Sequence, residues 1–251
     1  YWQLGAATGR MTCSEPNCQQ IPRDSQFRES VVAPEGWVFV GADFSQMELR
    51  LLAIVAQDEN MCNAFIEGKD LHTVTAEALG CDRQIAKSAN FGLAYGSGAK
   101  GLRNYAAGMG VSITLQEATD VRNQWLDTYY GVRAWHRRLA KESDKTAGQL
   151  PVIHVPVSRL RRFLPGDINR LTIRANTPVQ GAGAAILKCA IGSLWKHLQG
   201  SDEAKLCACI HDEVLCLVKK GKEEKWMEIL RDCMESAEAK WLGDVPAVAD
   251  V

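Results

Sequence analysis

The sequence lacks the features of a membrane-spanning or a secreted protein. No apolar run approaches the roughly 20 residues that a membrane-spanning helix needs, and no basic segment followed by an apolar one opens the chain. The nine cysteines are an odd number and include no Cys-x-x-Cys pair, so we expect reduced, buried thiols and neither disulfides nor a zinc site. Internal repeats and low-complexity linkers are also missing. With 46% apolar and 24% charged residues, the composition is that of an ordinary globular protein with no membrane partner.

A strong excess of positive charge is missing too, which argues against a protein held to nucleic acid by charge alone. The formal net charge is −1, but the charges are unevenly distributed. Residues 122–174 carry eleven Lys and Arg against four Asp and Glu, whereas residues 201–251 carry seven against twelve. A basic surface beside an acidic segment suits a polyanion held near metal ions. The alternative is a solvated helical face, which is the commoner cause of such runs.

An apolar segment near the start of the chain ends in an acidic residue. WVFVGADF, residues 37–44, is typical of a buried strand, and it ends at Asp43. Ser45 and Glu48 have the spacing of a capping box, and apolar residues then recur at helical spacing. We therefore expect Asp43 to lie where a buried strand meets the N-terminus of a helix.

A second apolar segment also carries acidic residues. In CACIHDEVLCLV, residues 207–218, two apolar runs flank His211, Asp212 and Glu213, which predicts a hairpin with these residues at its tip. Such a tip beside Asp43 would bring together carboxylates that repel, and Mg²⁺ would relieve the repulsion. Neighbouring strand residues face opposite sides, so Asp212 and Glu213 cannot both point toward Asp43 unless the chain turns there. The alternative is that these acids are ordinary turn or cap residues.

Two cations and two aromatic rings share one face of a predicted helix. In DRQIAKSANFGLAYG, residues 82–96, Arg83, Lys87, Phe91 and Tyr95 are each four residues apart and form one stripe. Cations bind phosphates and a ring can stack on a base, so the stripe suits a nucleoside triphosphate. The alternative is an amphipathic helix whose basic side chains reach solvent.

The remaining pattern predicts an α+β fold with a large helical block inside it. The glycine-rich GSGAKG, residues 96–101, follows a helix instead of a strand, which argues against a dinucleotide site. Residues 59–135 have helical periodicity with glycine breaks, residues 151–165 alternate like a hairpin, and residues 182–198 predict another helix.

Several of these segments together resemble the DNA polymerase I family (family A), in the order in which its motifs occur. The resemblance is carried by TGRMTCSEPNCQQIP (8–22), GADFSQMELRLLA, LHTVTAEALG (71–80), RQIAKSANFGLAYG, NTPVQGAGA (176–184) and IHDEVL. It implies an α+β right-hand polymerase lacking most of the thumb, with an antiparallel palm sheet and a helical fingers insertion. The implied domains are a first palm part over residues 1–48, fingers over 49–160 and a second palm part over 161–251.

The resemblance implies a template-directed DNA polymerase that extends a primer 3′ end by two-metal-ion nucleotidyl transfer and releases pyrophosphate. Asp43, the Phe44 carbonyl and Asp212 match the ligands of two Mg²⁺ ions, which Mn²⁺ can replace. Glu213 is a possible secondary ligand, which alternation along the strand would point away from Asp43. Lys87 matches a residue that holds the triphosphate and protonates the pyrophosphate. The implied nucleotide-binding residues are Gln46, Glu48, His72, Arg83, Lys87, Phe91 and Tyr95, with Glu48 also acting as a steric gate against the ribose 2′-hydroxyl.

Primer-template DNA and deoxynucleoside triphosphates (dNTPs) are the implied partners of a monomeric catalytic core in the cytoplasm of a bacterial or phage-infected cell, or in an organelle. The positions that match DNA contacts are Arg10, Asn17, Gln19, Asn176, Gln180 and His211. Amide and guanidinium groups at such positions can test base-pair geometry through the minor groove without reading sequence. Without the resemblance, Asn17 and Asn176 would be interpreted as turn residues beside proline.

The chain also departs from the family pattern. Only ten residues separate His72 from Arg83, and Thr172 stands where many relatives carry a basic residue, which puts one DNA contact in doubt. Tyr1 is not a Met and the last residues predict a strand, so we expect both ends to be cuts. The resemblance implies that the thumb and any exonuclease, which lie upstream in this family, are not in this sequence. Two other functions stay open: a DNA-binding remnant without activity, and a related single-subunit RNA polymerase.

Overall fold

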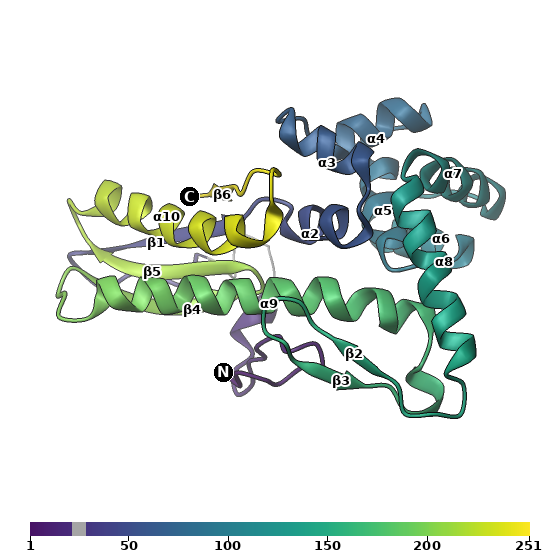
Figure 1. The fold of residues 1–251 in the computed structure, drawn as a ribbon. Helices are drawn as coiled ribbons and strands as arrows, with labels where there is room; N and C mark the ends of the chain where they lie inside the picture. The colour runs from purple at the N-terminus through teal and green to yellow at the C-terminus, as the bar shows by residue number, and fades with distance from the viewer. Residues whose placement is uncertain (22–28) are drawn as a thin grey trace. The chain divides into compact units, whose positions relative to one another are not determined.

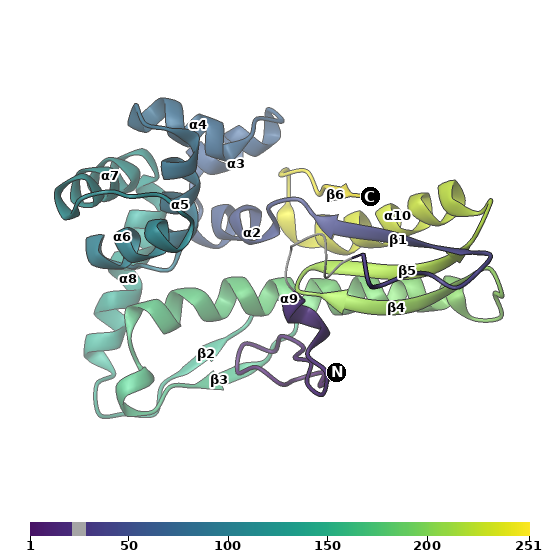
Figure 2. The ribbon, with the colours of Figure 1, turned by 180° about the vertical axis from the view of Figure 1, so that it is seen from behind.

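The computed structural model describes residues 1–21 and 29–251, so Pro22, the last residue of the first motif, lies outside the described residues. The chain combines α-helices with an antiparallel sheet, which confirms the predicted α+β class (Figures 1 and 2). It divides into two compact units. Unit 1 comprises Tyr1–Ser45, Gly183–Gly243 and Ala247–Val251, and unit 2 comprises Gln46–Ala182 and Asp244–Pro246. Among the described residues, no helix has the length and apolarity needed to cross a membrane.

Unit 1 is built on a four-stranded antiparallel sheet in the order β4-β5-β1-β6. The strands are β1 (Trp37–Phe44), β4 (Ala204–Ile210), β5 (Glu213–Lys219) and β6 (Ala249–Asp250), and a short 3-10 helix, η1, spans Cys18–Gln20. The predicted hairpin is confirmed, because β4 and β5 pair directly and only His211 and Asp212 lie between them. His211 adopts a left-handed backbone conformation (φ 59°), which allows the chain to reverse within two residues.

Two helices cover one face of this sheet, and the residues of the central strands on its other face are less buried. Both views show α10 (Glu223–Leu242) and the second half of α9 (Leu171–Leu198) on the same face (Figures 1 and 2). Val40, Ala42, Val214 and Cys216 are buried. They alternate with less buried neighbours, as expected for strands with one covered face. Asp43 is one of these less buried neighbours, so its carboxylate lies on the side of the sheet opposite α9 and α10.

Unit 2 is mostly helical, as the periodicity predicted, and the predicted hairpin near residues 151–165 is present. Its core contains the fully buried side chains of Phe65, Trp125 and Tyr129. The helix before GSGAKG confirms that this segment has no dinucleotide-binding context. The elements are α2 (Met47–Ala56), α3 (Glu59–Ile66), α4 (Leu71–Leu79), α5 (Arg83–Ala94), α6 (Ala99–Gly108), α7 (Leu115–Thr128), α8 (Tyr130–Lys145), β2 (Val152–His154), β3 (Arg161–Phe163), η2 (Gly166–Ile168) and the first part of α9.

The predicted capping box at Ser45 and Glu48 is wrong. The N-cap of α2 is Gln46, which has a left-handed backbone (φ 54°) and makes no side-chain cap bond. The helix therefore starts one residue later than a Ser45 cap requires, and Glu48 is not at the position from which it could close the box. Instead, the Glu48 carboxylate accepts a hydrogen bond from the Tyr95 hydroxyl.

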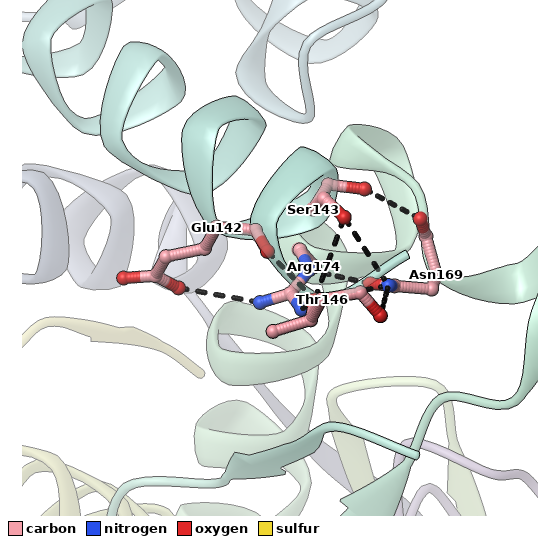
Figure 3. Close-up of polar contacts among 5 residues, drawn as sticks. All are labelled: Glu142, Ser143, Thr146, Asn169 and Arg174. Atoms are coloured by element: carbon pink, nitrogen blue, oxygen red, sulfur yellow. Dashed lines mark hydrogen bonds and ion pairs between the residues drawn. The ribbon is translucent and has the colours of Figure 1, made fainter. Parts of the chain in front are cut away.

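The helix predicted over residues 182–198 starts eleven residues earlier, at Leu171. The longer helix contains Pro178, although proline usually ends or kinks a helix. A polar network holds the first turn in place (Figure 3). Arg174, only 3% exposed, donates to Asn169 Oδ1 (2.8 Å) and Thr146 Oγ1 (2.7 Å) and forms an ion pair with Glu142 (3.2 Å). These bonds tie the start of α9 to the end of α8, so tertiary contacts outweigh the local signal.

All nine cysteines lie in the described part of the chain, and all nine thiols are free, as predicted. Burial raises the pKa of Cys209 to about 11 and that of Cys216 to about 12, so both thiols are protonated and unreactive at neutral pH. The expectation that every thiol is buried is wrong, because Cys189 and Cys207 are exposed.

Candidate functional site

Four carboxylates gather at one end of the unit 1 sheet. Asp43 is paired with Glu213 of β5 on one side and with Asp250 of β6 on the other, and residues directly opposite each other share a face. Asp212 lies at the hairpin tip, close enough for its charge to act on Asp43. The structure thus brings the two predicted metal ligands together. We call Asp43, Asp212, Glu213 and Asp250 the carboxylate cluster.

The expectation that Glu213 points away from Asp43 is wrong. It is directly opposite Asp43 in the register, on the same face of the sheet. Its Oε1 also lies 2.9 Å from where a Cβ on Gly41 would stand, so the side chain extends along that face. The chain turns at His211 and Asp212, which resets the alternation before β5 begins. Asp250 was missed altogether, and the only signal for it was an acid in the alternating VPAVADV segment.

The cluster disfavours the ionisation of its central member. Partial burial of the carboxylate, and after it the negative charges of Asp212, Glu213 and Asp250, raise the pKa of Asp43 to about 7. By surface area Asp43 is nonetheless exposed, so solvent and ions can reach it. A cation bound there would remove the repulsion and keep the carboxylate ionised.

The carboxylate oxygens of this cluster are ligands that suit Mg²⁺, which nucleotide-processing sites bind in the same way. Among residues 1–21 and 29–251, no three His, Cys, Asp or Glu side chains form a ready-made metal cage. Mg²⁺ seldom uses such cages, because it keeps several waters and takes one or two carboxylates together with substrate phosphates. Asp43 and Asp212 could supply the carboxylates, and the Phe44 carbonyl follows Asp43 on the same strand end.

In unit 2, the predicted stripe lies along the accessible side of α5. Arg83 is exposed, and Lys87, Phe91 and Tyr95 are half-buried. The opposite side of the helix is buried through Ala86, Ser88, Ala89, Asn90 and Gly92 to Ala94. Asp82 caps the helix start by accepting from the backbone N–H of Gln84 (2.7 Å). One face of α5 therefore presents cations followed by rings, as the spacing predicted.

The cationic end of this stripe lies beside His72 of α4. The charges of Arg83 and Lys87 act on His72, whose pKa is lowered mainly by burial. Arg83 forms an ion pair with Asp70 (2.9 Å), which also caps α4 and accepts a bond from Gln46 Nε2 (3.3 Å). The predicted phosphate-binding residues are thus neighbours, although exposed ion pairs such as Arg83–Asp70 contribute only about 0–1 kcal/mol.

The aromatic end of the stripe borders a pocket of about 340 Å³ inside unit 2. Five predicted residues line it: Glu48, Phe91, Tyr95, Asn176 and Gln180. Because Asn176 and Gln180 are one helical turn apart on α9, their amides lie on the same face.

Tyr105 of α6 also lines this pocket and was missed by the sequence analysis. Burial, and then the negative charge of Glu48, raise the pKa of its hydroxyl, so it remains a neutral donor. No motif pointed to it, because an aromatic residue in a helix is usually assigned to the core.

Among the predicted DNA contacts in unit 1, Gln19 contacts the edge strand β4 and His211 lies at the hairpin tip. Gln19 of η1 donates to the Cys209 carbonyl (3.4 Å), and the Asn17 side chain caps η1 by accepting from the Gln19 backbone (3.2 Å). Asn17 therefore has the turn role that its sequence context favoured. His211 is exposed at the tip, and Arg10 is half-buried.

The comparisons with known proteins agree with this architecture. The sequence model of DNA polymerase family A matches residues 1–251. The DNA polymerase I of Aquifex aeolicus (strain VF5) is 40% identical over 255 residues, which cover 97% of this chain and 43% of that protein. The thermostable DNA polymerase I of Thermus filiformis is 33% identical over 270 residues, which cover 99% of this chain and 31% of that protein. The chain therefore spans less than half the length of these relatives.

A solved structure gives the same result for the fold. The POL domain of Pol1 from M. smegmatis, solved in complex with DNA primer-template and dNTP, matches with a TM-score of 0.82 and 29% identity. The match covers 99% of this chain and 46% of that one. The fold is thus that of a polymerase domain. The chain belongs to DNA polymerase family A.

Proposed function

We propose that the protein containing this chain is a template-directed DNA polymerase that adds deoxynucleotides to a primer 3′ end. The carboxylate cluster is the observation that carries the proposal, because it joins two distant strand ends that match the family's metal ligands. In the reaction, the primer 3′-oxygen attacks the α-phosphorus of a dNTP, and pyrophosphate leaves. The proposed partners are primer-template DNA, dNTPs and two Mg²⁺ ions, which would assist deprotonation of the 3′-hydroxyl and offset the triphosphate charge.

The chain's own residues would bind and orient the nucleotide. Arg83, Lys87 and His72 would contact the triphosphate, and Gln46 is placed beside them through Asp70. Lys87 would deliver a proton to the departing pyrophosphate. Phe91 would pack on the nucleotide and Tyr95 on the template side. DNA contacts are assigned to Arg10, Asn17, Gln19, Asn176, Gln180 and His211.

Primer extension by the complete protein tests the proposal directly. We expect Mg²⁺-dependent incorporation of dNTPs opposite a template, with strong preference over rNTPs. Duplex binding without incorporation would instead support a DNA-binding remnant. Equal use of both sugars would favour the single-subunit RNA polymerase alternative.

Glu48→Ala is expected to lower the preference for dNTPs over rNTPs by at least about tenfold, the range reached when a pocket no longer excludes a small group. The Glu48 carboxylate lines the 340 Å³ pocket and is bonded to the Tyr95 hydroxyl, so it is fixed where it can exclude a 2′-hydroxyl. Steady-state incorporation of matched dNTP and rNTP measures the ratio. Glu48→Gln keeps the size and removes the charge, so it should retain the preference. A preference unchanged in Glu48→Ala would refute the gate.

Lys87→Met is expected to reduce the maximal rate of extension by about 10² to 10⁴, the usual contribution of a general acid. Lys87 lies on the accessible face of α5 near His72 and Arg83. Single-turnover incorporation at saturating dNTP would measure the loss. Lys69→Met is the control, because Lys69 is an exposed cation of unit 2 that pairs with Glu67 (2.5 Å) and should not affect the rate. If both variants lose the same activity, Lys87 has no special role.

A further inference from the structure

A buried hydrogen-bond chain inside unit 2 runs from Trp125 of α7 through Asn90 of α5 to His72 of α4. Trp125 Nε1 donates to Asn90 Oδ1 (2.7 Å), and Asn90 Nδ2 lies 2.9 Å from His72 Nδ1. Trp125 and Asn90 are fully buried, and His72 is 5% exposed. Each link therefore forms away from water, where an unmatched donor or acceptor is costly.

The chemistry of the first link determines the others. An indole N–H can only donate, so the Asn90 atom facing it must be the carbonyl oxygen. Thr75 Oγ1 also lies 3.1 Å from this oxygen, but a hydroxyl can donate or accept and this one donates to the Leu71 carbonyl (2.6 Å), so the indole sets the orientation of the amide. The amide nitrogen then faces His72, and because it can only donate, His72 Nδ1 must accept. In a neutral imidazole the proton is then on Nε2.

The surroundings of His72 favour that neutral form. Burial lowers its pKa, the charges of Arg83 and Lys87 lower it further, and Asp70 opposes them. A proton on Nδ1 would also face the N–H groups of the Asn90 amide. The Phe91 ring packs against the imidazole, with ring centroids 5.5 Å apart, and limits its rotation.

We propose that Asn90 is a positioning residue that holds His72 as the neutral Nε2–H tautomer, so that His72 donates a hydrogen bond to the triphosphate of the incoming nucleotide. The inference rests on the proposed function for the identity of this ligand. Trp125 sets the orientation of Asn90 and acts only through it. A ring with the opposite tautomer would present a lone pair to the phosphate oxygens and repel them.

Imidazole nitrogen NMR of protein labelled with ¹⁵N-histidine tests the tautomer without any assay of activity. The His72 signals are assigned by their loss in His72→Gln. We expect an unprotonated Nδ1 and a protonated Nε2 in the unliganded protein. A protonated Nδ1 in that protein would overturn the proposal.

Two variants separate positioning from general damage to the core. Asn90→Asp keeps the acceptor for Trp125 but offers a carboxylate oxygen to His72, so Nδ1 should become protonated. Tyr129→Phe is the matched control, because it removes a hydroxyl that bonds Thr75 (2.6 Å) in the same buried cluster and keeps the ring that packs against Trp125 (ring centroids 5.1 Å apart). It should leave the His72 signals unchanged. An Asn90→Asp spectrum identical to that of the unmodified protein, in a folded sample, would refute the role of Asn90.

Addition of a dNTP to the labelled protein tests the ligand. We expect the Nε2–H signal to shift while Nδ1 stays unprotonated, and a signal that does not respond to the nucleotide would overturn the contact. In extension assays, His72→Leu should raise the KM for dNTP by about 10-fold or more, as for loss of a hydrogen bond to a charged group. If the complete protein failed to extend primers yet showed the expected spectra and dNTP response, only the proposed function would fail.

Discussion

Asp43→Asn is expected to lower primer extension by at least about 10³-fold, since metal-assisted charge stabilisation contributes several kcal/mol to the transition state. Asp212→Asn should have a similar effect, because the two carboxylates lie together although about 170 residues separate them in the sequence. Single-turnover incorporation measures the loss, and a gel-shift assay should show that duplex binding survives.

Asp43→Asn should not destabilise the fold. The folded-state pKa of Asp43 is about 7, above the ordinary value of 3.8, so the fold favours the protonated form. The stability that protonated Asp43 contributes is therefore fully present below about pH 4 and is lost as the pH rises toward 7. The amide introduced by Asp43→Asn cannot ionise, so the stability of the variant should fall less over this range. Denaturant unfolding at several pH values checks the difference.

The control for Asp43→Asn is Asp202→Asn, which removes an exposed carboxylate from unit 1. Asp202 forms a surface ion pair with Lys219 (2.7 Å) and lies outside the carboxylate cluster. It should keep full activity. Mg²⁺ should raise the melting temperature of the unmodified protein more than that of Asp43→Asn. Full extension by both cluster variants would remove the metal assignment.

Arg174→Met is expected to destabilise unit 2 by about 1–3 kcal/mol, because the nearly buried guanidinium loses its bonds to Asn169 and Thr146, and hydrogen bonds to charged groups contribute about 1.5–3 kcal/mol. The pair with Glu142 adds little, because that carboxylate is 58% exposed. Methionine retains much of the apolar stem, so the loss reflects the guanidinium bonds to Asn169, Thr146 and Glu142 (Figure 3). Chemical denaturation would measure the change in the free energy of unfolding.

Arg170→Met is the matched control for the network, because Arg170 lies just before α9 and its side chain is exposed. It should change stability by no more than about 0.5 kcal/mol. A similar small change in Arg174→Met would mean that α9 begins at Leu171 without help from the network. The Arg174→Met variant should also weaken extension, since Asn176 and Gln180 follow on the same helix.

Local patterns predicted most elements because their causes are local. The stripe from Arg83 to Tyr95 depends only on helical spacing, and the hairpin around His211 depends on two apolar runs separated by a short polar break. The start of α9 could not be predicted in this way. Its first turn is held by Glu142 of α8 and by Thr146, the residue that caps α8, and the helix continues through Pro178, although proline usually ends or kinks a helix.

By itself, the sequence determined the class of fold, the family and the residues of its motifs, because periodicity and ordered motifs are properties of the chain. Only the tertiary structure decided which residues outside the motifs lie beside the motif residues. Asp250 reaches Asp43 through strand pairing, and Tyr105 reaches the Glu48 pocket through helix packing. The orientation of Asn90 depends on Trp125, 35 residues away, because a buried donor must meet an acceptor once folding has removed water.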